Sequence, residues 1–183
     1  MNEPYWKVKG RRTLYESEWV NLRLYDVELP DGRVIEHHAC EHPFHAVGVV
    51  PILGDGRILL VDHYRFICGT RGFEIPSGRM EAGESPEAAG ARELLEETAH
   101  EAGSVRHVGR FNPSNGISDQ VFHVVVARGV APRPGAAYDT NEISGVSAFT
   151  FGEIVDMTLA GRVPDGLTLA GLFLAEKSGE LPR

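Results

Sequence analysis

Short apolar runs and amphipathic stretches alternate along this chain. Apolar runs over residues 45–53 and 58–66, joined by a glycine-rich turn at 54–57, are typical of buried strands. The same reasoning predicts further strands and three helices. The strands fall at 73–76, 105–111, 120–127 and 146–151, and the helices at 86–99, 151–159 and 167–177. Strands interleaved with helices favour an α/β fold, an α/β/α sandwich around a mixed sheet.

Residues 1–43 have a different pattern from the rest. Roughly alternating polar and apolar positions predict strands at 5–9, 20–27 and 34–40, with a hairpin turn at 30–33. We expect a small antiparallel β appendage here, followed by a main domain over 44–183. Trp6 and Trp19 favour a local core, with a subunit contact as the alternative.

Four histidines lie between His37 and His45, close to Cys40. On a strand, His37 faces the opposite side from His38, Cys40 and His42. The spacing matches no structural zinc site. We therefore interpret these side chains as ordinary strand residues.

The helix predicted at 86–99 carries an acidic face. Ser85 can cap it and Pro86 suits its first position. At 100° per residue, one face holds Ala88, Ala91, Leu94, Leu95 and Thr98, and the other holds Glu93, Glu96 and Glu97, with Arg92 at its margin and Glu84 just before the helix. Like charges at this spacing destabilise a helix unless they are compensated. Solvent and Arg92 could compensate them, or divalent cations could bind them.

The spacing of these residues resembles the signature of the Nudix hydrolases. Its positions are filled by Gly78, Glu84, Arg92, Glu93, Leu94, Glu96 and Glu97. Two later positions depart from it, because Ala99 stands where glycine is usual and His100 where an aliphatic residue is usual. Neither position supplies a metal ligand, so we interpret the departure as structural. The resemblance implies the Nudix fold and a metal-dependent hydrolase.

Length and composition are typical of one soluble globular unit with a small appendage. The chain has 183 residues and a formal net charge of −8, which argues against a nucleic-acid or anionic-membrane partner. The two cysteines form no C-x-x-C pair, and we find no signal peptide and no run of transmembrane length. We expect a cytoplasmic protein.

Other stretches resemble the ADP-ribose pyrophosphatase branch of that family. They are His63-Tyr64-Arg65, Phe73 to Gly78, and the loop Asn115-Gly116-Ile117-Ser118-Asp119. The resemblance implies that Arg65 and Glu74 contact substrate, together with Gly116, Ser118 and Asp119. Arg65 could instead form a surface salt bridge, and Glu74 could be a strand-edge carboxylate. Members of the branch are commonly dimers that exchange the appendage, which implies a homodimer.

The expected chemistry is hydrolysis of a pyrophosphate bond. The resemblance implies Mg²⁺ or Mn²⁺ on Glu93, Glu96, Glu97 and the backbone carbonyl of Ser77. We expect Arg92 to orient Glu84 or Glu96 rather than to touch substrate. By resemblance the general base is a loop glutamate, for which we choose Glu142 over Asp139; Glu96 or Glu97 is the alternative.

The expected substrate is a small nucleoside diphosphate linked to a moiety X. ADP-ribose or a nucleotide sugar is favoured, giving a nucleoside monophosphate and phosphorylated X. The alternatives are a dinucleotide, a CDP-alcohol or a coenzyme. A non-catalytic Nudix-like ligand sensor is a further alternative, but a sensor should have lost its metal carboxylates.

Overall fold

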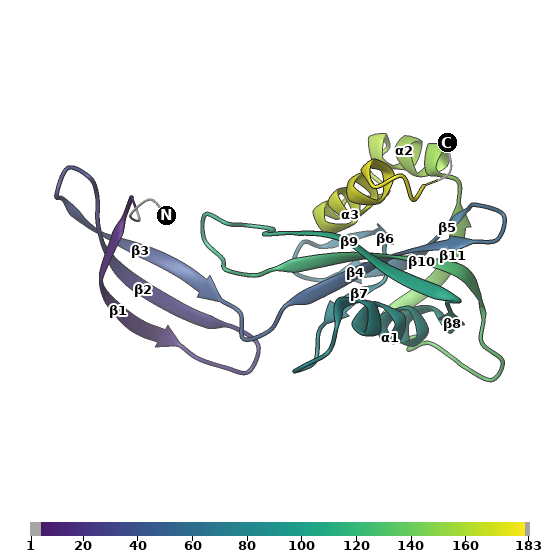
Figure 1. Ribbon diagram of the computed structural model, residues 1–183, viewed down its shortest axis with the longest axis horizontal. Coiled ribbons are helices and arrows are strands. Elements are labelled where there is room, and N and C mark those ends of the chain that lie inside the picture. Colours follow the sequence, from purple (N-terminus) through teal and green to yellow (C-terminus); the bar gives the residue numbers. More distant parts are fainter. Residues whose placement is uncertain (1–4, 182–183) are drawn as a thin grey trace. The chain divides into compact units, whose positions relative to one another are not determined.

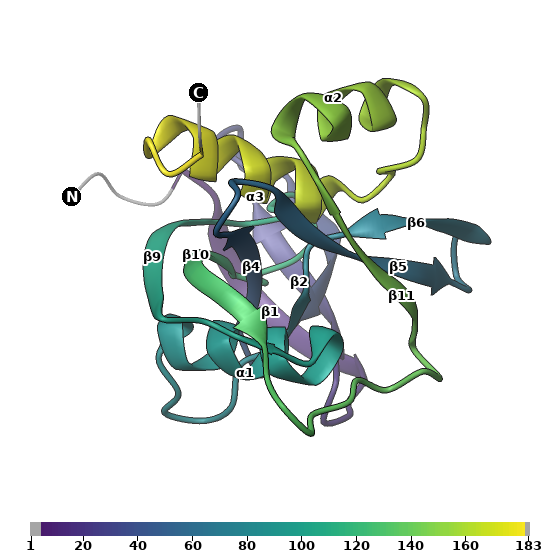
Figure 2. The same ribbon diagram turned by 90° about the vertical axis from the view of Figure 1, so that its right-hand side faces the viewer.

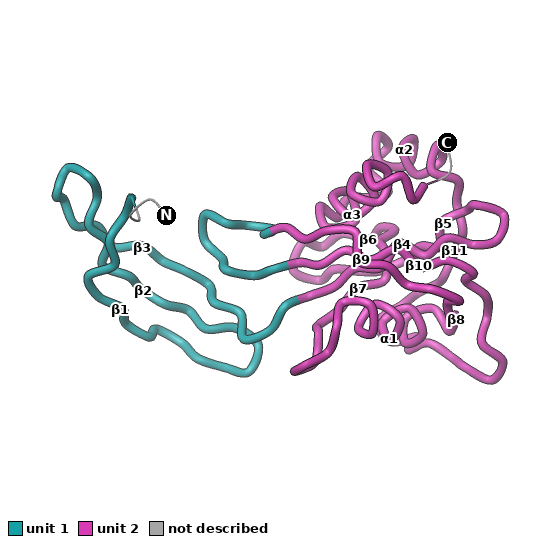
Figure 3. Tube along the Cα trace, in the orientation of Figure 1, with its two compact units in different colours: residues 1–45, 112–121 teal, residues 46–111, 122–183 magenta. Residues whose placement is uncertain are grey.

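The computed structural model describes residues 5–181, which form two compact units (Figure 3). The first contains residues up to 45 together with the segment 112–121, and the second contains 46–111 and 122 onward. Within the described part of the chain, no helix has both the length and the apolar composition needed to cross a membrane. The predicted boundary between residues 43 and 44 stays a prediction, since the first unit also includes a later segment.

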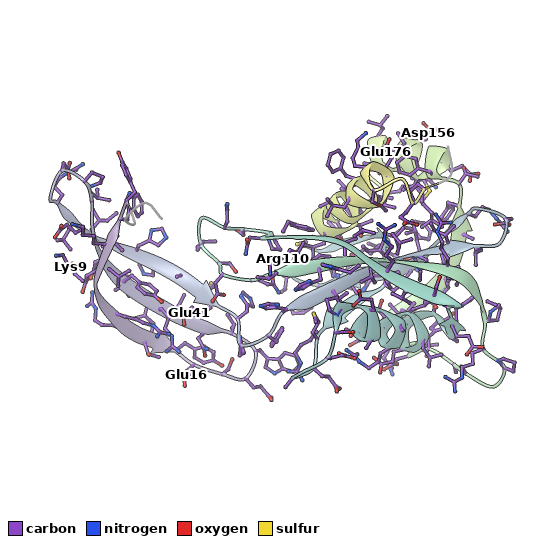
Figure 4. The ribbon with its side chains drawn as sticks, viewed as in Figure 1. Lys9, Glu16, Glu41, Arg110, Asp156 and Glu176 are labelled. Atoms are coloured by element: carbon purple, nitrogen blue, oxygen red, sulfur yellow. The ribbon has the colours of Figure 1, made fainter. Side chains whose placement is uncertain are left out.

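The first unit is built on an antiparallel sheet of order β1-β2-β3 (Figure 1). Its strands are β1 (Lys7–Tyr15), β2 (Asn21–Glu28) and β3 (Val34–Glu41). Arg23 on β2 is buried and pairs with Glu16 at 2.8 Å and Glu41 at 3.2 Å. Figure 4 labels Glu41 on this sheet, as well as Lys9, which pairs with Glu28 at 2.7 Å. Cross-strand ion pairs therefore stabilise a sheet that buries few apolar side chains.

Both tryptophans of this unit are substantially exposed, with 46% of Trp6 and 58% of Trp19 accessible. Trp6 makes an edge-to-face ring contact with His37, and Trp19 makes one with Phe44. The prediction that they form a local core is wrong, because a three-stranded sheet has too little volume to enclose an indole. Their exposure agrees with the alternative of a subunit contact.

Residues 112–121 bind to the edge of β3. Cys40 N donates to Ile117 O at 2.7 Å, and His42 N donates to the carboxylate of Asp119 at 2.8 Å. The imidazole of His37 bonds to Gly116 O at 3.1 Å. His37 on β3 and His42 directly after it thus hold this loop in place.

The second unit contains a mixed eight-stranded sheet, which confirms the predicted α/β class. Its strands are β4 (Ala46–Leu53), β5 (Ile58–Arg65), β6 (Thr70–Glu74), β7 (Ser77–Arg79), β8 (His100–Glu101), β9 (Ser104–Phe111), β10 (Phe122–Pro132) and β11 (Ile143–Phe149). Strands β4 and β10 pair in parallel at the centre, while the other pairs are antiparallel.

Helices cover both faces of this sheet, as the α/β/α prediction requires. Helix α1 (Pro86–Thr98) lies on one face, and α2 (Phe151–Leu159) and α3 (Gly166–Lys177) lie on the other in both views (Figures 1 and 2). Successive residues of β10 point to opposite faces of the sheet. Phe122, Val124 and Val126 pack in the α2–α3 core, while Val125 and Ala127 pack under α1. Helix α1 is therefore held against a well-packed face of the sheet.

Several predicted boundaries shift. Strand β10 continues to Pro132, beyond the predicted end at residue 127, because Ala131 and Pro132 pair with β8. Strands β7 and β8 are three and two residues long, too short to show a hydrophobic period. Strand β7 therefore adds a short pairing between the predicted strand at 73–76 and the predicted helix at 86–99.

Helix α1 ends at a residue in the left-handed region. Ala99 has φ 57° and ψ 27°, and its N–H bonds to Leu95 O. This is the position where the family signature has glycine, and a left-handed L-residue costs roughly 1–2 kcal/mol.

Replacing Ala99 with glycine should therefore stabilise the protein. We expect the free energy of unfolding to rise by about 0.5–1 kcal/mol, because relief of the strained φ exceeds the entropy that glycine adds to the unfolded chain. Chemical denaturation measures this. The matched control is Ala91→Gly at an exposed position inside the same helix, which should destabilise by about 1 kcal/mol. A loss of stability in Ala99→Gly would contradict the strain argument.

Candidate active site

The signature segment brings the backbone of β7 against α1. Strand β7 pairs with Ala46–Gly48 of β4, and this fixes the position of Ser77 and Gly78. Ser77 N donates to Glu97 Oε2 at 3.1 Å. A Cβ on Gly78 would lie 2.3–2.5 Å from the carboxylate atoms of Glu93, so any side chain here would force the Glu93 carboxylate to move. Position 78 thus admits only glycine while Glu93 keeps this place.

Arg92 connects the acidic side chains of this segment. It donates to both oxygens of Glu84 at 3.1 and 3.0 Å, to Glu93 at 2.7 Å and to Glu96 at 3.0 Å. It also donates to Arg79 O at 2.8 Å. Glu84 accepts from Glu81 N as well, which fixes the loop before the helix. One guanidinium therefore bridges three carboxylates, and its single positive charge offsets only part of their negative charge.

Two carboxylates of α1 are removed from water. Burial raises the pKa of Glu93, partly offset by its bond to Arg92. Burial also raises the pKa of Glu97, to about 8, against the opposing bond from Ser77 N. Glu84 behaves differently, since its bonds to Arg92 lower its pKa. Glu97 is therefore largely protonated at neutral pH unless a cation replaces the proton.

The face of α1 that packs on the sheet differs from the one expected. Its buried residues are Ala89, Gly90, Glu93, Leu94 and Thr98, while Ala88 and Ala91 are exposed. Glu93 thus lies on the buried side, and the prediction that all three glutamates oppose the apolar face is wrong for this residue. The reason is Gly90, where a Cβ would come within 2.3 Å of Val125, so the missing side chain lets this side of the helix approach β10.

The donor set here fits a hard divalent cation. Glu93, Glu96, Glu97 and the Ser77 carbonyl offer only oxygen, the ligand type of Mg²⁺ and Mn²⁺. The glycine at 78 leaves the backbone of β7 open to the Glu93 carboxylate. As the side chains of residues 5–181 stand, no three acidic, histidine or cysteine groups are close enough to chelate an ion. Cation binding would thus require some of these side chains to move closer together.

Arg65 and Glu74 form a second charged pair in this unit. Arg65 Nε and Nη2 donate to Glu74 Oε2 at 3.1 and 2.6 Å, and the Glu74 side chain is only 4% exposed. Glu74 is therefore a buried partner of Arg65 at the end of β6, and its contact with substrate stays a prediction. Arg65 itself remains half-exposed, so its outer edge is still available to a phosphate.

Sequence reasoning missed the residues that anchor this pair. Ile75 N, directly after Glu74, donates to the buried hydroxyl of Thr168 at 3.0 Å. Thr168 in turn donates to Asp165, the N-cap of α3, at 2.7 Å. An aspartate three residues before a threonine is a capping pattern, and it was the available signal for this anchor.

A cavity of about 600 Å³ opens beside Arg65. It is lined by His63, Tyr64, Arg65, Phe66, Ile67, Cys68, Asn141, Glu142, Ser144 and Asp165. These residues come from β5, the turn after it, the segment before β11, β11 itself and the start of α3. The two loop carboxylates of the prediction differ in position. Asp139 accepts two bonds from Asn141 in a tight turn, whereas Glu142 is exposed and lines the cavity.

The predicted substrate loop lies in the first unit. Gly116, Ser118 and Asp119 border a cavity of about 320 Å³ together with residues of the N-terminal sheet, among them Tyr25 and Glu41. Each of them forms a hydrogen bond with His37 or His42, and Ser118 and Asp119 also bond to backbone groups. Their role in substrate binding stays a prediction.

Comparison with known proteins identifies the class. Residues 42–168 match the NUDIX domain, and residues 6–39 match the nucleoside diphosphate sugar hydrolase N-terminal domain. The chain therefore belongs to the Nudix family and is a Nudix hydrolase.

Individual relatives carry different names. The chain is 32% identical to a methanol dehydrogenase activator of Bacillus methanolicus, over 85% of this chain and 84% of that protein. It is 31% identical to a CMP-5'-(N-acetyl-N-hydroxy-3-aminopropyl)phosphonate hydrolase of Streptomyces rubellomurinus (92% and 81%), and 33% identical to an ADP-ribose pyrophosphatase of Bacillus subtilis (66% and 65%). A solved ADP compounds hydrolase matches 99% of this chain and 100% of its own, with a TM-score of 0.85 at 18% identity, which confirms the fold.

Burial of Glu97 predicts a pH-dependent stability of the metal-free protein. A folded pKa near 8, above the unfolded value, means that stability is retained at acidic pH and is lost as pH rises towards and through 8. Glu97→Gln removes this loss. With a metal chelator at pH 8.5, its free energy of unfolding should therefore exceed that of wild type by on the order of 2 kcal/mol. At pH 5 the two should be nearly equal. Thermal denaturation at both pH values measures this, and an equal gap at both would contradict it.

Proposed function

We propose that this enzyme hydrolyses the pyrophosphate bond of a nucleoside diphosphate linked to a sugar, with ADP-ribose the favoured substrate. The observation that carries the proposal is the cluster of Glu93, Glu96 and Glu97 beside the Ser77–Gly78 backbone. The Arg65–Glu74 pair and the cavity next to it add a place for a phosphate and its substituent. The relative named ADP-ribose pyrophosphatase and the match to a sugar hydrolase N-terminal domain support this substrate class.

The chain's own residues take distinct roles in this proposal. Glu93, Glu96, Glu97 and the Ser77 carbonyl hold Mg²⁺ or Mn²⁺. A bound divalent cation would neutralise phosphate oxygens and acidify a water. Arg65 offers its exposed edge to a phosphate while Glu74 fixes its plane. Arg92 holds Glu84 and spaces the helix carboxylates.

A second substrate class is supported by one relative. The Streptomyces protein is named for a CMP-linked phosphonate, so a cytidine nucleotide is the alternative.

A nucleotide panel with Mg²⁺ and with Mn²⁺, scored by released phosphomonoester, separates ADP-ribose, UDP-glucose and CDP-alcohols. Glu97→Gln should lower kcat at least about 100-fold on the best substrate, and Glu87→Gln in the first turn of the same helix should not. Wild-type turnover by Glu97→Gln at saturating Mg²⁺ would remove the metal assignment.

We assign the general base to Glu142, which lines the cavity from a loop. A proton acceptor must be free of the metal, and the Asp139 carboxylate is already bonded to Asn141. Glu142→Gln should lower kcat about 100-fold or more with little change in KM, and should flatten the acidic limb of the pH–rate profile.

The matched comparison is Asp139→Asn. Activity lost in Asp139→Asn and kept in Glu142→Gln would move the assignment to Asp139. Full activity in both would place the base on α1, at Glu96 or Glu97.

We also propose a homodimer in which the N-terminal sheet contacts the second copy. Its exposed apolar side chains, Trp6, Val8, Tyr15 and Trp19 among them, support this. Removing residues 1–40 should convert the dimer to a monomer in sedimentation velocity, with the second unit still folded by circular dichroism. Removing only residues 1–4 is the control and should leave the dimer intact. A full-length monomer at micromolar concentration would reject the proposal.

A further inference from the structure

His63 lies on β5 in the second unit, at the wall of the 600 Å³ cavity. It is opposite Ile143 of β11 and Gly72 of β6 in the register of the sheet. Residues two apart on a strand share a face, so its imidazole is on the same side of β5 as Arg65.

The imidazole is incompletely bonded. Among residues 5–181, His63 Nδ1 is the one buried side-chain nitrogen or oxygen that has no hydrogen-bond partner. Buried polar atoms are nearly always paired, because an unpaired one loses its bond to water and gains nothing. A half-turn about the Cβ–Cγ bond exchanges Nδ1 with Cδ2, so a bonding group in the cavity could recover the missing bond. A ligand in the cavity could therefore supply the hydrogen bond that His63 Nδ1 lacks.

The surroundings of His63 determine what kind of group this ligand offers. Burial, together with the positive charge of Arg65, lowers the pKa of His63, so the ring is neutral at neutral pH. A neutral imidazole can accept one hydrogen bond and donate another, as a hydroxyl group does. The other polar side chains in the cavity are Asn141, Glu142, Ser144 and Asp165, which suit several hydroxyls at once, while Tyr64 and Phe66 add aromatic surface.

We infer that His63 forms a hydrogen bond with a sugar hydroxyl of the X moiety, and that this cavity is the sugar subsite. The inference rests on the proposed function and adds to it a specificity-determining residue. The phosphate next to X would then lie at Arg65, on the same face of β5. His63 contacts substrate in this arrangement and does not take part in bond cleavage.

The test measures kcat/KM for wild type, His63→Ala and His63→Gln. The substrates are ADP-ribose, analogues that lack single hydroxyls of the terminal ribose, and ADP methyl ester, which has no second sugar. Loss of one hydrogen bond should lower kcat/KM of His63→Ala on ADP-ribose roughly 5- to 10-fold. One deoxy analogue should show no further loss in this variant, and neither should the methyl ester, because the partner of His63 is already missing. His63→Gln should restore part of the activity. His38→Ala, at an exposed histidine of the N-terminal sheet, is the control and should match wild type.

The outcomes separate the inference from the proposed function. If wild type cleaves none of these compounds or other nucleotide sugars, the proposed function fails and the inference fails with it. If wild type cleaves ADP-ribose but His63→Ala lowers kcat/KM equally on all substrates, the function stands and the sugar contact is rejected. If His63→Ala instead changes only the preference among nucleobases, the cavity holds the base and the inference is overturned. Circular dichroism of each variant excludes unfolding as the cause.

Discussion

Burial of negative charge on α1 is the constraint on which this site depends. Glu93 and Glu97 are four residues apart on one helix, and packing on the sheet withdraws both from water. Arg92 and the Ser77 amide compensate part of that cost, and protonation of Glu97 compensates more. The folded protein thus holds carboxylates whose remaining electrostatic cost a bound cation would lower. Packing of the helix on the sheet therefore positions these groups before any cation binds.

The spacing of the signature made the helix and its carboxylates predictable, but not their burial. Positions on a helix follow from 100° per residue, whereas the side that faces the sheet follows from tertiary packing. The deciding residue was Gly90, whose missing Cβ admits Val125. A glycine inside a helix indicates only that something comes close, and the sequence did not say what. The end of the helix at Ala99 was predictable because the family has glycine there.

Contacts between distant segments were the least predictable part of the site. The resemblance marked Arg65 and Glu74 as substrate residues, yet the bond between them depends on the pairing of β5 with β6. The anchor of Ile75 on Thr168 joins residues 93 positions apart, so no local pattern could reveal it. Likewise the loop at 115–119 was recognisable as a motif, but its attachment to β3 was not.

The membership of residues 112–121 in the first unit has a consequence for how the chain folds. The N-terminal sheet and this loop are separated in sequence by the strands and helix of the second unit, from Ala46 to Phe111. A ribosome releases the loop long after β3 has emerged, so the edge of β3 stays without its partner during that interval. Completion of the N-terminal unit therefore depends on closing a long chain segment, which is slow compared with forming a local hairpin. The N-terminal sheet is thus synthesised well before the loop that completes its unit.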